Sequence, residues 1–190
     1  MSKQEPIKAM EIHGEKKKIV LAGNPNVGKS VFFNSLTGIY VDVSNFPGTT
    51  VDVSHGHFEE YAVIDTPGVY GISSFNDEEK VARDVILTAD LIVNVVDAVH
   101  LERDLFLSLQ VIETGIPTII VLNMMDDAKR EGLKIDLALL EEQLGVPVIP
   151  AVAIKGKGLK ELKEKLREAR TGNIPLERQA QLKALEQQVK

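Results

Sequence analysis

The most informative octapeptide of the chain is Gly23-Asn24-Pro25-Asn26-Val27-Gly28-Lys29-Ser30, which matches the pattern G-x-x-x-x-G-K-[ST]. The octapeptide follows the apolar run 18–23, which has the composition of a buried strand. After it come Phe32, Phe33 and Leu36, whose spacing is that of the apolar face of a helix. A strand that leads through such a loop into a helix is the context in which this pattern binds phosphate.

The residue types of this loop explain how it would hold a phosphate chain. Gly28 has no Cβ, so the backbone can approach the phosphates closely. Loop amides and the helix N-terminus direct positive partial charge toward an anion. We expect Lys29 to contact the β- and γ-phosphates and the Ser30 hydroxyl to bind Mg²⁺. The predicted nucleotide contacts in this part of the chain are Asn24, Pro25, Asn26, Val27, Gly28, Lys29, Ser30 and Val31.

Strand-like and helix-like segments alternate along the rest of the chain. We expect strands at 18–23, twice within 51–64, and at 90–97, 117–123 and 146–150. We expect helices at 28–37, 76–88, 102–114, 136–144 and 158–170, and a loop at 39–48. Asn76 can cap the second helix, because Glu79 lies three residues on. The alternation predicts an α/β fold: a three-layer sandwich with a mostly parallel six-stranded sheet and helices on both faces. Together with the phosphate-loop motif, this makes the P-loop NTPase, small-GTPase-like class the expected fold.

Composition narrows the function classes. The chain has 190 residues, with 22 basic and 28 acidic side chains and a formal net charge of −6, so we expect no nucleic-acid partner. It has no cysteine, which excludes disulfides and thiolate metal sites. No apolar run reaches the roughly 18 residues of a membrane-spanning helix, so we expect a soluble segment, which could be the cytosolic part of a larger membrane protein. We expect a polar leader at 1–17, the nucleotide-binding domain at 18–170, and at 171–190 a linker followed by a solvated tail helix or the start of a helical domain.

A second motif, Asp65-Thr66-Pro67-Gly68, ends a short apolar strand that includes Val63 and Ile64. Asp65 is in position to hold the Mg²⁺ shell, directly or through water. The Gly68 N–H can donate to the γ-phosphate, a bond that hydrolysis would release. An aspartate before a Pro-Gly turn is often ordinary turn chemistry, but its place after a phosphate loop favours the functional interpretation.

Thr49 and Thr50 lie between these two motifs, at the end of the expected loop. We expect Thr50, which directly precedes a strand, to complete the Mg²⁺ shell and close over the γ-phosphate. The alternative is that a β-branched residue simply begins the strand there.

The run Asn123-Met124-Met125-Asp126 ends the strand expected at 117–123, and N-x-x-D in this order is the guanine-reading signature. The Asp126 carboxylate would accept hydrogen bonds from guanine N1–H and the 2-amino group, whereas adenine would leave it unpaired. We expect Asn123 to brace the loops. Met124 occupies the position at which many GTPases stack a lysine on the base.

The last element of the expected nucleotide site follows the final strand. Val152 and Ala153 occupy this place, and we expect the Ala153 N–H to donate to guanine O6. A backbone donor leaves little mark on a sequence, so this assignment is weakly specific.

Val69 follows Gly68, where small GTPases such as Ras carry a glutamine that orients the attacking water. Hydrolysis would therefore rest on electrostatic positioning. The side-chain oxygen of Asn26 could hold a monovalent cation in place of an arginine finger, or Asn26 could only shape the loop. The predicted catalytic residues are Lys29, Thr50, Gly68 and Asn26.

Together these motifs resemble a known family. The octapeptide, Phe33-Asn34-x-Leu36-Thr37-Gly38, the run from Asn45 through Pro47 and Gly48 to Thr50, Asp65-Thr66-Pro67-Gly68-Val69-Tyr70 and Asn123-Met124-Met125-Asp126 are similar to the N-terminal G domain of bacterial ferrous iron transport protein B (FeoB). The resemblance covers about residues 18–170.

The resemblance implies a regulatory GTPase, using GTP/GDP and Mg²⁺, attached to a membrane domain for Fe²⁺ uptake at the cytoplasmic face of the bacterial inner membrane. It implies K⁺-stimulated hydrolysis with Asn26 as the K⁺ ligand, and Thr50 as the switch threonine. Its partners would be guanine nucleotide and the C-terminal helical and transmembrane domains of the same protein, with a homo-oligomer left open. The competing interpretations are a cytosolic ribosome-assembly or tRNA-modification GTPase and a binding switch that hardly hydrolyses GTP.

Overall fold

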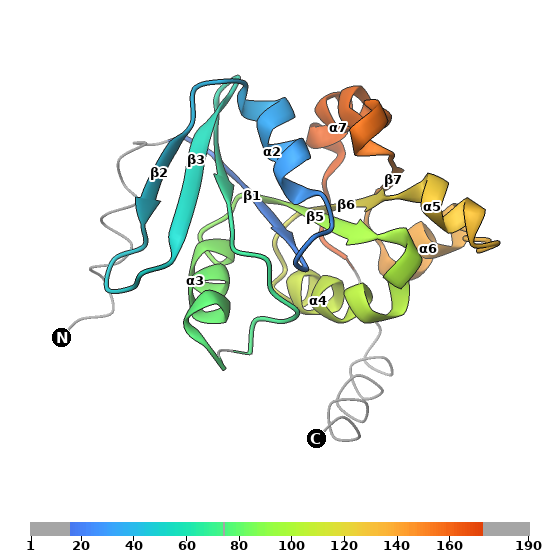
Figure 1. The fold of residues 1–190 in the computed structure, drawn as a ribbon, viewed down its shortest axis with the longest axis horizontal. Coiled ribbons are helices and arrows are strands. Elements are labelled where there is room, and N and C mark those ends of the chain that lie inside the picture. Colours follow the sequence, from blue (N-terminus) through green and yellow to red (C-terminus); the bar gives the residue numbers. More distant parts are fainter. Residues whose placement is uncertain (1–15, 74, 173–190) are drawn as a thin grey trace.

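The centre of the structure is a seven-stranded sheet with the strand order β2-β3-β4-β1-β5-β6-β7 (Figure 1). The structure is a computed structural model that describes residues 16–73 and 75–172. The strands are β1 (Lys18–Gly23), β2 (Asp42–Asn45), β3 (Asp52–Phe58), β4 (Tyr61–Asp65), β5 (Leu91–Asp97), β6 (Thr118–Asn123) and β7 (Val148–Pro150). The helices are α2 (Lys29–Thr37), α3 (Asp77–Ile86), α4 (Leu101–Glu113), α5 (Met125–Arg130), α6 (Leu137–Leu144) and α7 (Leu159–Lys165), with short 3₁₀ turns at Ala98–His100, Ala153–Lys155 and Leu166–Glu168.

The predicted fold class is confirmed, but the sheet has seven strands and not six. Strands β4, β1, β5, β6 and β7 pair in parallel, whereas β3 pairs antiparallel with both β4 and β2. The additional strand is β2, which lies within the segment that we expected to be a loop. All four of its residues are exposed. Backbone pairing with β3 therefore forms this edge strand without the alternation of apolar residues that marks a strand in sequence.

Alternate residues of β1 face opposite layers of helices. Ile19 and Leu21 pack with residues of α2 and α7, whereas Val20 and Ala22 pack with residues of α3 and α4. Figure 1 shows the same arrangement, with α2 and α7 on one side of the sheet and α3 and α4 on the other. Because β1 is covered on both faces, its sequence is a continuous apolar run. The burial of β1 from Ile19 to Gly23 fixes the position of the loop that follows it.

The ends of α3 follow the expected chemistry. The Asn76 side chain accepts the N–H of Glu79 over 2.8 Å, and the Glu79 carboxylate accepts the N–H of Phe75 over 3.0 Å. The first bond satisfies one of the backbone donors that the first turn of the helix leaves unpaired, and the second satisfies the N–H of the residue before the cap. The expected cap is therefore confirmed, with the helix shorter than predicted.

Two other helices differ from the expectation. The helix expected at 158–170 is α7, which ends at Lys165 and continues only as a 3₁₀ turn. The six-residue α5 was not expected at all, because six residues give too few apolar positions for a helical period. Its start at Met125 nevertheless matters, since Asp126 lies in its first turn.

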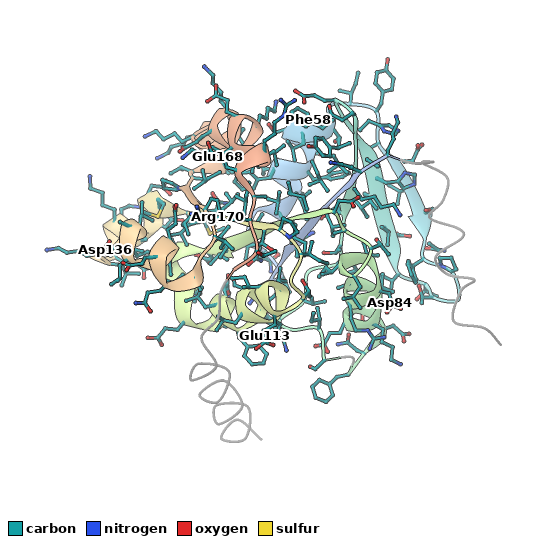
Figure 2. All side chains as sticks on the ribbon, turned by 180° about the vertical axis from the view of Figure 1, so that it is seen from behind. Phe58, Asp84, Glu113, Asp136, Glu168 and Arg170 are labelled. Atoms are coloured by element: carbon teal, nitrogen blue, oxygen red, sulfur yellow. The ribbon has the colours of Figure 1, made fainter. Side chains whose placement is uncertain are left out.

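The last described segment returns to the sheet. The Thr118 N–H at the start of β6 donates to the carbonyl of Arg170 over 3.0 Å, and the Arg170 guanidinium pairs with Glu141 over 3.1 Å. Figure 2 labels Arg170 on the rear of the molecule, with Asp136 and Glu168 at its periphery. The leader expected at 1–17 falls almost wholly outside the described residues, as does nearly all of the segment 171–190. None of the helices within 16–73 and 75–172 has the length and apolar content to cross a membrane.

Candidate nucleotide-binding site

The predicted phosphate loop lies at the carboxyl edge of the sheet, between the ends of two other strands. Strand β1 pairs with β4 on one side and β5 on the other, so that Leu21 is in register with Asp65 and Gly23 with Val95. The connection after β1 leads to α2 on one face of the sheet, whereas the connections after β4 and β5 lead to α3 and α4 on the other face. In a parallel sheet, ligands bind at the point where the connections diverge in this way. The pairing of β1 with β4 therefore places the octapeptide beside Asp65.

Two residues of the loop have left-handed backbone conformations. Asn26 has φ 64° and Gly28 has φ 86°. Asparagine tolerates this region better than most residues, and glycine adopts it freely. Gly28 also has a packing role, because a Cβ there would lie 2.5 Å from Nδ2 of Asn123. The phosphate loop and the predicted base-reading loop thus meet at Gly28.

Lys29 forms an ion pair with Asp65, and its Nζ also donates to the carbonyl of Thr66. Both side chains are largely shielded, with 10% of Lys29 and 18% of Asp65 exposed. Burial raises the pKa of Asp65, although the charge and hydrogen bond of Lys29 act in the opposite direction. The predicted phosphate ligand and the predicted metal ligand are therefore in direct contact.

The segment Asp65–Gly68 is bonded to the phosphate loop and its strand. The Thr66 hydroxyl donates to the carbonyl of Leu21 over 2.6 Å, and the Val69 N–H donates to the carbonyl of Gly23 over 3.1 Å. A Cβ on Gly68 would lie 2.9 Å from Cα of Pro25. The two predicted phosphate-contacting segments therefore touch each other at Gly68, and only glycine permits this close approach.

The two threonines after β2 have different surroundings. The Thr49 hydroxyl donates to the carbonyl of Phe46 over 2.8 Å and accepts the N–H of Val51 over 3.1 Å. Thr49 thus stabilises the turn between β2 and β3. Thr50 is exposed, which leaves its hydroxyl accessible to a ligand.

Asn123 joins three segments of the predicted site. This buried residue donates from Nδ2 to the carbonyl of Val27 over 2.9 Å, and its Oδ1 accepts the N–H of Ala153 over 3.0 Å. Its side chain therefore spans the end of β6, the phosphate loop and the turn after β7. These contacts agree with the bracing role expected for Asn123. They also engage the Ala153 N–H, which we expected to face guanine O6.

Asp126 is partly exposed and has charged neighbours. Its Oδ2 lies 3.0 Å from Nζ of Lys155, and its Oδ1 accepts the N–H of Asp127 over 2.9 Å. The hydrogen bond from Lys155 is the main cause of a lowered pKa at Asp126. The carboxylate is therefore ionised at neutral pH. Just before it, Met124 has φ 62°, a backbone conformation that non-glycine residues seldom adopt.

Asp104 in α4 is a site residue that the sequence did not indicate. Only 1% exposed, its carboxylate accepts Asn24 Nδ2 over 2.8 Å, the Asp97 N–H over 2.9 Å and Arg103 Nε over 3.0 Å. The Arg103 guanidinium also lies over the ring of Tyr70, 5.6 Å from its centroid. Asp104 therefore links the first loop residue, the end of β5 and the segment behind Gly68. No local pattern could have revealed it, because Asn24 and Asp104 are far apart in sequence.

The structure brings most of the predicted residues to one edge of the sheet. Lys29 pairs with Asp65, Gly68 packs against Pro25 of the phosphate loop, and Asn123 bonds both Val27 of that loop and Ala153. Asn26 and Ser30 are exposed in the same loop. Asn24, Val27 and Val152 are buried, and the Asn24 side chain is bonded to Asp104, so only their main chain could contact a ligand.

Comparison with known proteins identifies relatives of this chain. A family model described as ferrous iron transport protein B matches residues 17–166. The Fe(2+) transporter FeoB of Shigella flexneri is 42% identical over 159 residues, which cover 78% of this chain and 21% of that protein. The chain thus spans about a fifth of the length of the curated relatives it matches.

Solved structures agree with this result. A GDP-bound point mutant of S. thermophilus NFeoB matches with a TM-score of 0.79 and 42% identity, covering 84% of this chain and 66% of that one. The G domain of T. maritima FeoB matches with a TM-score of 0.72 and 40% identity, covering 80% of this chain and 97% of that one. The resemblance stated from the motifs is confirmed. The chain belongs to the ferrous iron transport protein B family, and its described fold is that of the family's G domain.

Proposed function

We propose that the chain binds and hydrolyses GTP as the regulatory domain of a bacterial Fe²⁺ uptake transporter, with Mg²⁺ required and K⁺ stimulating hydrolysis. The observation that carries the proposal is the position of Asn123, whose side chain bonds Val27 of the phosphate loop and Ala153 of the last turn. Asp126 follows three residues later. The grip on phosphate and the recognition of the base are therefore parts of one braced site.

The choice of base rests on Asp126. Its carboxylate has two oxygens for the two N–H groups that guanine presents, at N1 and the 2-amino group. Adenine has an acceptor at N1 and lacks that amino group, so it would leave a charged group unpaired at a cost of kilocalories. An aspartate carboxyl group is ionised at neutral pH even at its ordinary pKa, so the accepting form of Asp126 is the one present. With Met124 and Val152 beside it in the site, this end would hold the base.

The residues around Lys29 fit Mg²⁺. Binding of a triphosphate would draw Lys29 toward the phosphates and leave the largely buried Asp65 carboxylate in need of another cation. The exposed Ser30 hydroxyl supplies a further oxygen ligand, and closure of the turn between β2 and β3 over the site would bring the Thr50 hydroxyl to it. No three His, Asp or Glu side chains gather as a metal site in 16–73 or 75–172. Mg²⁺ usually takes one or two protein ligands together with phosphate oxygens and water, and Asp65 and Ser30 fit that pattern. When bound, Mg²⁺ neutralises charge on the phosphate oxygens.

Asn26 is the residue proposed to bind K⁺. It lies exposed in the phosphate loop with φ 64°. Its amide oxygen could hold a monovalent cation whose charge would act where other GTPases use an arginine. Val69 supplies no polar group to orient water, which leaves Lys29, Gly68, Thr50 and this cation to stabilise the transition state.

The proposed setting is the cytoplasmic face of the bacterial inner membrane. The G domain would span 18–170, and the bond from Thr118 to Arg170 supports that end. The residues before it would form a polar leader, and 171–190 would lead into the helical and transmembrane domains of the full-length protein. Family membership favours this interpretation over a ribosome-assembly or tRNA-modification GTPase. A homo-oligomer through those further domains is compatible with it.

The test compares nucleotides and ions on the purified chain. With Mg²⁺ present, fluorescent GTP and GDP should bind far more tightly than fluorescent ATP, and EDTA should abolish hydrolysis. Single-turnover hydrolysis should be faster in KCl than in NaCl at equal ionic strength. Preference for ATP, or failure to bind either nucleotide, would contradict the proposal. In the full-length protein, Lys29→Ala should abolish Fe²⁺ uptake by cells.

A further inference from the structure

Lys155 makes a contact for which the proposed function has no use. Its ammonium nitrogen lies 3.0 Å from Oδ2 of Asp126, while Oδ1 of the same carboxylate accepts the N–H of Asp127 over 2.9 Å. Each oxygen of the group that would read guanine therefore already has a donor from the chain itself. One of these donors is fixed main chain and the other is the end of a flexible side chain.

The two donors differ in whether guanine would have to displace them in order to bind Asp126. The Asp127 N–H belongs to the first turn of α5, and a carboxylate oxygen has a second lone pair with which to accept guanine. The ammonium group of Lys155 is charged and hydrated, and it occupies the space from which a donor group of the base would approach Oδ2. Guanine would have to displace it, whereas it could leave the main-chain bond intact.

The backbone keeps Lys155 beside Asp126 in any case. The Lys155 N–H donates to the carbonyl of Val152 over 3.0 Å, and Val152 pairs with Lys157 in an isolated antiparallel bridge. Gly156 ends the turn with φ 74°. At the other end, the Ala153 N–H is bonded to Asn123. Because the turn is bonded on both sides, only the lysine side chain needs to move, and 58% of it is exposed.

We propose that Lys155 competes with guanine for the Asp126 carboxylate and thereby lowers the affinity of the chain for guanine nucleotides. The inference rests on the proposed function, because it requires Asp126 to read guanine. The apparent dissociation constant equals the intrinsic one divided by the fraction of molecules in which the carboxylate is accessible. Lys155 reduces that fraction, so it acts as an affinity-determining residue without contacting the nucleotide.

The size of the effect follows from the exposure of the pair. Ion pairs between exposed side chains have small coupling energies, which correspond to a factor of roughly 1.5 to 5 in an equilibrium constant. With 22% of Asp126 exposed, solvent screens this pair only in part. Removal of the Lys155 charge should therefore tighten GDP binding by about two- to fivefold.

The first experiment compares two lysines of one turn. Dissociation constants for a fluorescent GDP would be measured for the wild-type chain, Lys155→Met and Lys157→Met. Lys157 is exposed and lies two residues on, so its replacement removes the same charge without touching Asp126. We expect Lys155→Met to bind GDP two- to fivefold more tightly, Lys157→Met to match the wild type, and Lys155→Arg to stay within twofold of it. Equal or weaker binding by Lys155→Met would overturn the inference, and so would the same gain in Lys157→Met.

The second experiment tests whether the effect passes through Asp126. In the Asp126→Asn background, xanthosine diphosphate replaces GDP and position 126 has no negative charge to attract Lys155. Adding Lys155→Met should then leave the affinity for xanthosine diphosphate unchanged; a remaining gain would mean that Lys155 acts elsewhere and would overturn the inference. Failure of the wild-type chain to bind GDP would instead overturn the proposed function, so the two failures can be distinguished.

Discussion

The side-chain nitrogen of Asn123 donates to the main-chain carbonyl of Val27 over 2.9 Å. Together with the bond from the Ala153 N–H, this contact makes one buried side chain the brace of the site. We expect Asn123→Ala to lower the free energy of unfolding by about 2–4 kcal/mol, because two buried main-chain groups lose their partners. GDP affinity should fall by more than tenfold. Urea unfolding and titration with fluorescent GDP measure the two effects, and unchanged values would show that the brace is dispensable.

Asp126→Asn should change the preferred base. The asparagine amide presents an N–H donor toward the 2-amino group of guanine, which is also a donor. The 2-oxo group of xanthine can instead accept a hydrogen bond from that amide. We expect GDP affinity to fall at least tenfold and xanthosine diphosphate to bind better than GDP, measured by competition against a fluorescent nucleotide. Asp127→Asn is the matched control, because it makes the same change at the adjacent residue, whose carboxylate pairs with Arg130. Unaltered preference for guanosine in Asp126→Asn would refute the assignment.

Asn26→Ala should remove the stimulation of hydrolysis by KCl and leave GDP binding nearly unchanged. The reason is that only the proposed cation site uses the side-chain oxygen of Asn26. Alanine at φ 64° is strained, however, so Asn26→Gly is the better partner variant, because glycine adopts this conformation freely and also lacks the oxygen. Single-turnover rates in KCl and NaCl should coincide for both variants. A rate in KCl that still exceeds the rate in NaCl by the wild-type factor would exclude Asn26 as the ligand.

Asp104→Ala should destabilise the chain by about 3 kcal/mol, because Asn24 Nδ2 and the Asp97 N–H would lose a buried, charged acceptor. Asp104→Asn keeps one acceptor oxygen and should be affected less. Chemical denaturation of the two variants ranks them. Because asparagine has the shape of aspartate, an equal cost for the two variants would mean that the loss of the negative charge sets the effect and that the remaining neutral acceptor contributes little.

Asn76→Ala should cost about 1 kcal/mol of stability through loss of the cap of α3. Asn76→Ser can still accept the Glu79 N–H and should lie close to the wild type. Glu79→Ala should show a smaller loss, since it removes only the bond to the exposed Phe75 N–H. Thermal or urea unfolding checks the order. An alanine variant as stable as the serine variant would contradict the role of the cap.

The sequence was sufficient to predict those parts of the structure that repeat a local pattern. Strand β1 and helix α2 could be predicted because Ile19–Ala22 are apolar and Phe32, Phe33 and Leu36 follow helical spacing, and all of these residues are buried. Strand β2 could not, because its four residues are exposed and depend on pairing with β3. A single edge strand formed by backbone bonds leaves no hydrophobic period in the sequence.

The site shows the same limit more sharply. Gly28, Lys29, Asp65 and Asn123 could be predicted because each belongs to a motif whose residue types follow from phosphate and base chemistry. The contact of Asn24 with Asp104 could not be predicted, because it depends on how α4 packs beside β1 and β5. The contact of Lys155 with Asp126 depends likewise on the turn after β7. Motifs indicate which groups meet the ligand, whereas only the fold reveals which groups meet one another.

The tight fit at Gly28 has a consequence for the design of inactive variants. A methyl group on this residue would collide with the Asn123 amide that holds the base-reading loop in place. Alanine at position 28 would thus act as a wedge that spreads the loop from its neighbour, besides blocking the anion. A substitution chosen to disable one half of the pocket would in practice disable both.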